Sequence, residues 1–76
     1  MAKVTVYSRN NCMQCKMTKR FLTEHHVDFD ERNINEEPQY IDYLKENGFQ
    51  SLPVVEANGD LQFSGFQPAK LQQLAV

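Results

Sequence analysis

The first 26 residues predict a strand, a short polar turn and a helix, with a cysteine where the turn becomes the helix. Lys3–Tyr7 alternates and is rich in β-branched residues, which is typical of a strand. Ser8–Asn11 is polar, and Met13–His26 contains neither glycine nor proline, so we expect a helix that begins at or just after Cys12. If another strand follows this helix, the two strands form a parallel pair through a right-handed crossover.

The middle of the chain supplies that second strand and a second helix. Val27–Ile34 carries spaced apolar residues and is predicted to be a strand. Asn35–Pro38 combines a candidate cap, early acidic residues and a proline, which indicates the start of a helix, and Asn47 with Gly48 indicates its end. The apolar side of this helix consists of Tyr40, Ile41 and Leu44.

The last third of the chain predicts a hairpin followed by a helix. Leu52–Val55 and Asp60–Phe63 are short strand-like segments, and Asn58-Gly59 between them is a strong two-residue turn signal. Pro68 then begins a short helix, with Leu71 and Leu74 on one side. The order is therefore βαβαββα. It predicts an α/β fold in which three helices flank a mixed four-stranded sheet.

Length and charge limit the classes of function. The 76 residues suffice for one domain, which we expect to span 1–76. The net charge of −2 does not favour nucleic-acid or membrane-surface binding, and the apolar runs are too short for a transmembrane helix. Nothing in the sequence requires more than a monomer. No secretion signal is recognisable at the start, so we expect a cytoplasmic protein. In that compartment, a pair of cysteines indicates redox chemistry or metal binding.

Cys12 and Cys15 form a C-x-x-C motif at the predicted start of the first helix. Disulfide exchange needs a thiolate, and the unpaired N–H groups and positive dipole end of a helix N-terminus favour that anion. Cys12 is therefore expected to be exposed and to attack a substrate disulfide. Cys15, nearly one turn later, would resolve the mixed disulfide and leave an internal Cys12–Cys15 bond. A bridge this short stabilises a fold little, so the pair is better placed for chemistry than for stapling the chain.

The predicted first helix also carries basic and apolar residues. Met17 and Phe21, at helical spacing, are expected to lie in the core. Four basic residues flank the motif: Arg9, Lys16, Lys19 and Arg20. We expect some of them to add positive potential near the thiolate or to contact an acidic partner. For Lys19 and Arg20, a solvated helix face is the simpler interpretation.

A zinc site is the main alternative for the two cysteines. It would need four ligands and could recruit His25 and His26. Adjacent helical residues point about 100° apart, so these histidines are poorly placed to share one ion. We therefore expect no metal, and we interpret both histidines as helix-end residues.

Three blocks of the sequence, taken together, resemble those of a known protein family. They are Val6–Lys16, Gly48–Val55 and Phe63–Pro68. The first resembles many redoxins of the glutaredoxin-like branch of the thioredoxin superfamily, and the Ser-Gly-Phe sequence of the third narrows the resemblance to NrdH redoxins. The resemblance covers essentially the whole chain. It implies a thioredoxin/glutaredoxin fold and an electron donor that passes electrons from thioredoxin reductase to the large subunit of class Ib ribonucleotide reductase.

The resemblance also implies partner-binding residues. Pro53 would be cis and face the cysteines, and the backbone of Leu52 would pair with an extended substrate segment. Gly65 would permit close approach of a partner. Phe66 is expected either to contact a partner or to pack in the core. The remaining candidates are Ser64, as a donor or a helix cap, and Met13 and Gln14, on the exposed rim of the motif.

The chain departs from glutaredoxins that use glutathione. Those proteins have Cys-Pro-Tyr-Cys, whereas this chain has Met13-Gln14 between its two cysteines. Their Gly-Gly and Thr/Ser-Asp pairs are replaced here by other residues within Ser64–Pro68. Without the residues that hold its charged γ-glutamyl end, glutathione loses charge-assisted hydrogen bonds. We therefore expect weak or no glutathione binding. Two alternatives stay open: a glutathione-dependent glutaredoxin, and a non-catalytic adapter that senses redox state. The expected redox group is the Cys12–Cys15 disulfide, without another cofactor.

Overall fold

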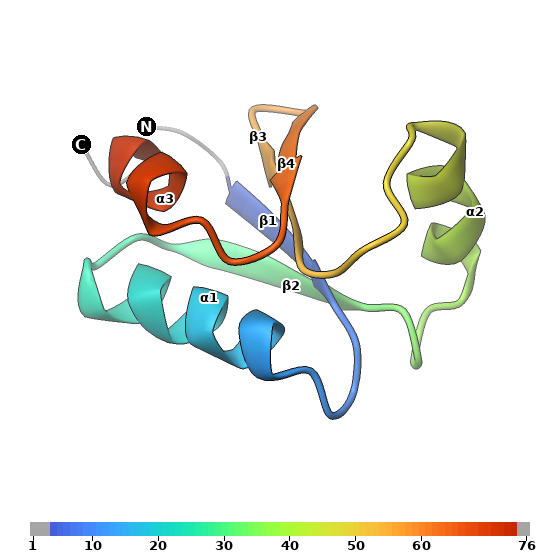
Figure 1. The fold of residues 1–76 in the computed structure, drawn as a ribbon, viewed down its shortest axis with the longest axis horizontal. Helices are drawn as coiled ribbons and strands as arrows, with labels where there is room; N and C mark the ends of the chain where they lie inside the picture. Colours follow the sequence, from blue (N-terminus) through green and yellow to red (C-terminus); the bar gives the residue numbers. More distant parts are fainter. Residues whose placement is uncertain (1–3, 75–76) are drawn as a thin grey trace.

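The computed structural model describes residues 4–74 and has the predicted order of elements (Figure 1). The elements are β1 (Val4–Ser8), α1 (Met13–Glu24), β2 (Phe29–Asn33), α2 (Gln39–Glu46), β3 (Val54–Ala57), β4 (Asp60–Ser64) and α3 (Pro68–Leu74). The βαβαββα prediction is confirmed. Lys3, the predicted first residue of the first strand, lies outside the described residues.

The four strands form one mixed sheet in the order β2-β1-β3-β4. β1 is parallel to β2, with Val4 opposite Phe29, and antiparallel to β3. β3 and β4 form the predicted antiparallel hairpin, whose turn residues Asn58 and Gly59 have φ values of 55° and 85°. Positive φ at both positions is what a two-residue turn needs to match the strand twist.

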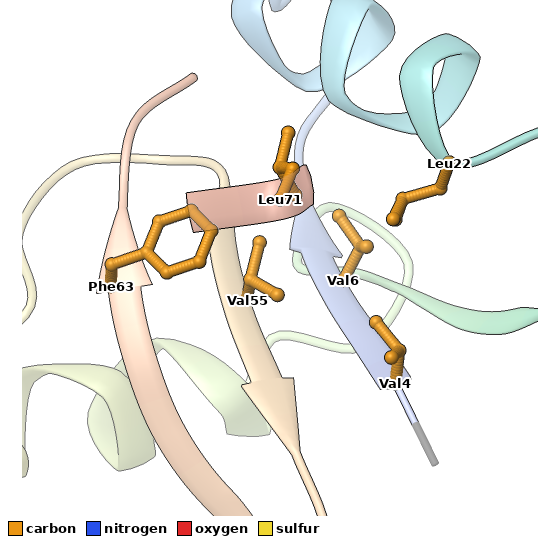
Figure 2. Close-up of a cluster of buried hydrophobic side chains, with 6 residues drawn as sticks. All are labelled: Val4, Val6, Leu22, Val55, Phe63 and Leu71. Carbon is orange, nitrogen blue, oxygen red and sulfur yellow. The ribbon is translucent and has the colours of Figure 1, made fainter. Parts of the chain in front are cut away.

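The helices cover the two faces of the sheet unequally. Alternate residues of β1 point to opposite faces, which separates Val4 and Val6 from Thr5 and Tyr7. On the first face, called the α1/α3 face, α1 and α3 lie side by side (Figure 1). Figure 2 shows Leu22 of α1 and Leu71 of α3 meeting the strand side chains of this face. The buried cluster consists of Val4, Val6, Leu22, Val55, Phe63 and Leu71.

The opposite face, called the α2 face, is covered by the eight residues of α2. Its buried cluster is Tyr7, Leu44 and Val54. Tyr43 packs at its edge, and Tyr43 and Tyr7 both donate hydroxyl hydrogen bonds to Oε2 of Glu56, at 3.0 and 3.3 Å. Burial, together with the nearby Glu56 carboxylate, holds the pKa of Tyr7 well above its usual range. Tyr7 is therefore a neutral hydrogen-bond donor.

The buried side of α1 differs from the prediction at Met17, which is 42% exposed. The residues that are buried are Cys15, Thr18 and Leu22. A hydroxyl is tolerated there because Thr18 Oγ1 donates to the carbonyl of Gln14 at 2.9 Å. The expected core position of Met17 is therefore wrong, whereas Phe21 packs, partly buried, against the α1/α3 cluster.

Element boundaries differ most around α2. The helix begins after Pro38, which occupies the N-cap position without a side-chain cap. Asn35, the candidate cap, instead accepts the backbone N–H of Asn10 on its Oδ1 at 2.8 Å. Gly48, with a φ of 85°, follows the last turn as predicted. Within residues 4–74, no helix is long and apolar enough to cross a membrane.

Candidate active site at Cys12 and Cys15

Cys12 occupies the N-cap of α1, as the sequence predicted. Its backbone is extended (φ −111°, ψ 107°), and its carbonyl accepts the N–H of Lys16 at 3.1 Å. Its sulfur accepts the N–H of Cys15 at 3.2 Å. A cysteine sulfur therefore takes the role that a serine or aspartate oxygen usually has at a helix N-terminus. An N–H directed at this sulfur stabilises negative charge on it, as thiol chemistry requires.

Cys12 and Cys15 are joined by a disulfide, so the structure is of the oxidised state. Their Cα atoms are 5.2 Å apart. Cys15 is only 1% exposed and belongs to the buried side of α1, whereas Cys12 is half-buried. The expectation of an exposed Cys12 is met in part, and Cys12 is the cysteine of the pair that a partner can reach.

The turn before Cys12 is held by three asparagines. Nδ2 of Asn33 donates to Oδ1 of Asn10 at 3.0 Å, and the backbone N–H of Asn35 donates to Oδ1 of Asn33 at 2.8 Å. The bond from Asn10 N–H to Asn35 completes a closed network. Sequence reasoning singled out Asn35 alone, as a helix cap, and did not identify Asn10 or Asn33. The signal was present, because residues that follow parallel strands meet at one edge of the sheet.

The Leu52–Pro53 peptide bond is cis, as the resemblance implied, and its carbonyl faces the disulfide. The sulfur of Cys12 is 4.0 Å from the carbonyl oxygen of Leu52. Pro53 is buried and Leu52 is half-buried. The structure therefore brings together the two cysteines and the loop expected to bind a substrate segment.

The Ser-Gly-Phe block connects to both of these segments. The N–H of Gly65 donates to the carbonyl of Pro53 at 2.7 Å, and the N–H of Phe66 donates to Oε1 of Gln14 at 3.2 Å. Gly65 has a φ of 81°, and a Cβ there would lie 3.6 Å from the same Gln14 oxygen. Gln14 is thus more than an exposed rim residue, because its side chain joins the C-x-x-C motif to the loop at 64–67.

The remaining candidates lie around this centre. The ring of Phe66 packs against the α1/α3 cluster and meets Phe21 edge-on at 6.4 Å, which favours the core interpretation. Ser64 is half-buried, and its carbonyl accepts Nε2 of Gln67 at 2.7 Å. Met13 is 69% exposed and Arg9 is exposed, so both side chains are accessible beside the disulfide.

The basic residues near the motif have different surroundings. Nζ of Lys19 pairs with Oε2 of Glu31 at 2.6 Å, and the Ser8 hydroxyl donates to the same oxygen at 2.7 Å. The Lys19 hydrogen bond, with that from Ser8, holds the pKa of Glu31 below its usual range. Arg20 pairs with Glu24 on the surface of α1. Within residues 4–74, Arg9 and Lys16 form no ion pair.

The zinc alternative gains no support from the described residues. His25, at the C-cap of α1, stacks on the ring of Phe21 with centroids 4.1 Å apart. No group of three or more His, Cys, Asp or Glu side chains in residues 4–74 is arranged to hold a metal ion. The redox group present in the site is the disulfide itself.

Comparison with known proteins gives the family. The glutaredoxin family model matches residues 4–62. The glutaredoxin-like protein NrdH of Lactococcus lactis subsp. lactis (strain IL1403) is 53% identical over 95% of this chain and 99% of its own length. NrdH of Escherichia coli (strain K12) is 42% identical over 95% of this chain and 88% of its own length.

A solved structure agrees with this assignment. NrdH-redoxin from Escherichia coli, a glutaredoxin-like protein described as having a thioredoxin-like activity profile, superposes with a TM-score of 0.88 at 40% identity. The match covers 95% of this chain and 93% of that one. With the Cys12–Cys15 disulfide at the start of α1 and the cis Pro53 beside it, the chain belongs to the glutaredoxin family, as a redox protein of the NrdH type.

Proposed function

We propose that this protein carries electrons from thioredoxin reductase to the large subunit of class Ib ribonucleotide reductase through Cys12 and Cys15. The observation that carries the proposal is a disulfide between a half-buried and a buried cysteine, in a chain of the NrdH type. The thioredoxin-like activity described for the Escherichia coli relative supports thioredoxin reductase as the source of electrons.

The proposed cycle starts from the reduced protein. The Cys12 thiolate attacks one sulfur of the acceptor's disulfide; that bond breaks, and the leaving thiolate takes a proton from solvent. Cys15 loses its proton and attacks the Cys12 sulfur, which releases the second acceptor thiol and re-forms the Cys12–Cys15 bond. Two electrons have then passed to the acceptor. The dithiol of thioredoxin reductase reverses the exchange, starting at Cys12.

The partner segment is proposed to lie along the cis-proline loop. Cys12 is 4.0 Å from the carbonyl of Leu52, so a segment that pairs with the Leu52 backbone would bring its own disulfide to Cys12. Met13 and Arg9, which are exposed, and Gly65, which is half-buried, would border the same segment. The half-buried Ser64 and Phe66 would support this border.

Weak glutathione use is part of the proposal. The N–H groups of Gly65 and Phe66 are already bonded, to Pro53 and to Gln14. A glutathione carboxylate would have to displace these bonds, and the replacement of the usual small and acidic residues within Ser64–Pro68 removes its charge partners. Residues 1–76 are proposed to act as one monomeric domain in the cytoplasm.

The decisive experiment follows NADPH consumption during disulfide reduction with two sources of electrons in parallel. One reaction contains thioredoxin reductase, and the other contains glutathione and glutathione reductase. Turnover in the first reaction alone is expected, and class Ib ribonucleotide reductase is then tested as the acceptor. Turnover in the second alone would establish a glutathione-dependent glutaredoxin. Little turnover in either would favour a redox-sensing adapter.

The roles of the two cysteines are tested separately. Cys15→Ser is expected to trap mixed disulfides with its partners through Cys12, because the resolving thiol is missing. Cys12→Ser is expected to trap none, since Cys15 is 1% exposed. Non-reducing electrophoresis and mass spectrometry identify the trapped species. Trapping by Cys12→Ser and not by Cys15→Ser would reverse the assignment.

A further inference from the structure

An open depression of about 530 Å³ lies beside the disulfide. Both cysteines line it, together with the turn before α1 and the first part of that helix. Three cationic side chains line it as well: Arg9, Lys16 and Lys19. None of the residues that line it within the described chain is acidic. A chain with a net charge of −2 therefore presents local positive charge next to its redox centre.

The three cations are not equivalent. Lys19 is paired with Glu31, whose carboxylate offsets its charge. Arg9 and Lys16 are exposed and have no ion pair within residues 4–74. Arg20, also basic and on α1, does not line the depression and pairs with Glu24. The unbalanced positive charge near Cys12 therefore comes chiefly from Arg9 and Lys16.

The wall that carries Arg9 is fixed before any partner arrives. The neighbouring Asn10 is bonded to both Asn33 and Asn35, which ties the turn to the end of β2. Asn10 and Asn33 also line the depression. Because the turn is already ordered, little further ordering of its backbone is needed when a partner binds.

We infer that this depression binds an acidic segment next to the disulfide of the partner protein. The inference rests on the proposed function, because it describes the chemistry of the segment that Cys12 attacks. Carboxylates within about three residues of the attacked cysteine reach Arg9 and Lys16, since an extended chain spans roughly 3.3–3.6 Å per residue. Opposite charges at such a rim speed the encounter and favour partners of matching charge.

The test uses two peptides with an internal disulfide that differ only in two flanking residues, Glu in one and Gln in the other. The fully reduced protein reduces each peptide in a single turnover, and quenched samples are separated by chromatography. The rates are divided by those of dithiothreitol with the same peptides, which removes differences in intrinsic reactivity. The Glu peptide is expected to react about fivefold faster at low salt, and the preference should fade as screening increases.

Two double variants connect this preference to the depression. Arg9→Gln with Lys16→Gln is expected to bring the Glu-to-Gln rate ratio close to one. The matched control, Arg20→Gln with Lys70→Gln at an exposed position of α3, removes the same charge outside the depression and should keep the ratio. The ratio within one variant is insensitive to changes in Cys12 reactivity, because both peptides meet the same thiolate.

The other outcomes are distinct. Equal rates for both peptides with the unmodified protein would overturn the acidic-partner inference and leave thiol–disulfide exchange intact. A preference that survives in the Arg9 and Lys16 double variant would likewise overturn it. If neither peptide is reduced, thiol–disulfide exchange itself fails and the inference falls with it.

Discussion

The two faces of the sheet are filled with different chemistry. On the α1/α3 face the buried cluster is aliphatic except for Phe63, and two helices cover it (Figure 2). On the α2 face Tyr7 takes the central position, with Tyr43 beside it, and both bond to the Glu56 carboxylate. One short helix covers this face, and depressions of about 220 and 200 Å³ remain there.

The two faces therefore contribute differently to the redox site. Cys15 and Leu22 lie on the same buried side of α1, so the tightly packed face is also the one that holds the resolving cysteine. Around α2, an apolar depression extends to Leu52, the residue before the cis proline. The α1/α3 face carries the resolving cysteine, and the α2 face borders the loop that we propose binds the partner.

The largest expected effect is that of Leu22→Ala. Leu22 is 0% exposed and is covered from both helices and the sheet, so the cavity cannot collapse. We expect a loss of about 3–4 kcal/mol in the free energy of unfolding, measured by urea denaturation of the oxidised protein. The total stability of a chain this size is only about 4–11 kcal/mol, so a large part of it would be lost.

Leu44→Ala is the matched substitution on the α2 face. Leu44 is 4% exposed and also lines the 220 Å³ depression, so water and neighbouring side chains can take up part of the vacated space. We expect a smaller loss than for Leu22→Ala, about 2 kcal/mol, in the same urea experiment. Equal losses at the two positions would contradict the contrast in packing around Leu22 and Leu44.

Tyr43→Phe tests the polar component of the α2 face. It removes one of two hydroxyl donors to Glu56 while Tyr7 remains, so we expect a loss of about 1 kcal/mol. Tyr40→Phe is the control, because the Tyr40 hydroxyl makes no hydrogen bond within residues 4–74. If thermal denaturation shows the same loss for both variants, the Glu56 bonds do not contribute as proposed.

Glu31→Gln tests the polar rim of the α1/α3 face and should have the smallest effect. The hydrogen bond from Lys19, with that from Ser8, lowers the pKa of Glu31 in the folded state. The contribution of Glu31 to the free energy of unfolding is therefore fully present above the ordinary carboxyl pKa of 4.5. It is lost as the pH falls through the lowered pKa of the folded state. We expect a cost of about 0.5 kcal/mol at pH 7, as for a partly exposed pair.

The measurement for this variant is a series of urea midpoints from pH 7 down to pH 3. The difference between Glu31→Gln and the unmodified protein should shrink as the pH falls, because both then carry a neutral side chain. Glu24→Gln, which removes the exposed ion pair with Arg20, is the control for a surface pair on the same helix. A difference that grows toward acid would mean that the pKa of Glu31 is raised.

Local sequence signals predicted what local physics controls. Asn58-Gly59 identified the hairpin because both positions need positive φ, and the strand, turn and helix around Cys12 identified the motif. The prediction failed where a side chain found a partner far along the chain. Asn35 was expected to cap α2, but it holds Asn10 instead. Met17 was expected in the core, but Thr18 is buried in its place.

The sequence by itself determined the order of elements, the placement of Cys12 at a helix start and the pairing chemistry of the two cysteines. These depend on residue spacing within one or two turns or strands. Tertiary structure alone decided that β3 lies between β1 and β4 and that Gln14 bonds to Phe66, 52 residues away. It also decided which basic residues stay unpaired beside the disulfide. Contacts between residues far apart in the sequence leave no periodic signal, so only the packed chain selects them.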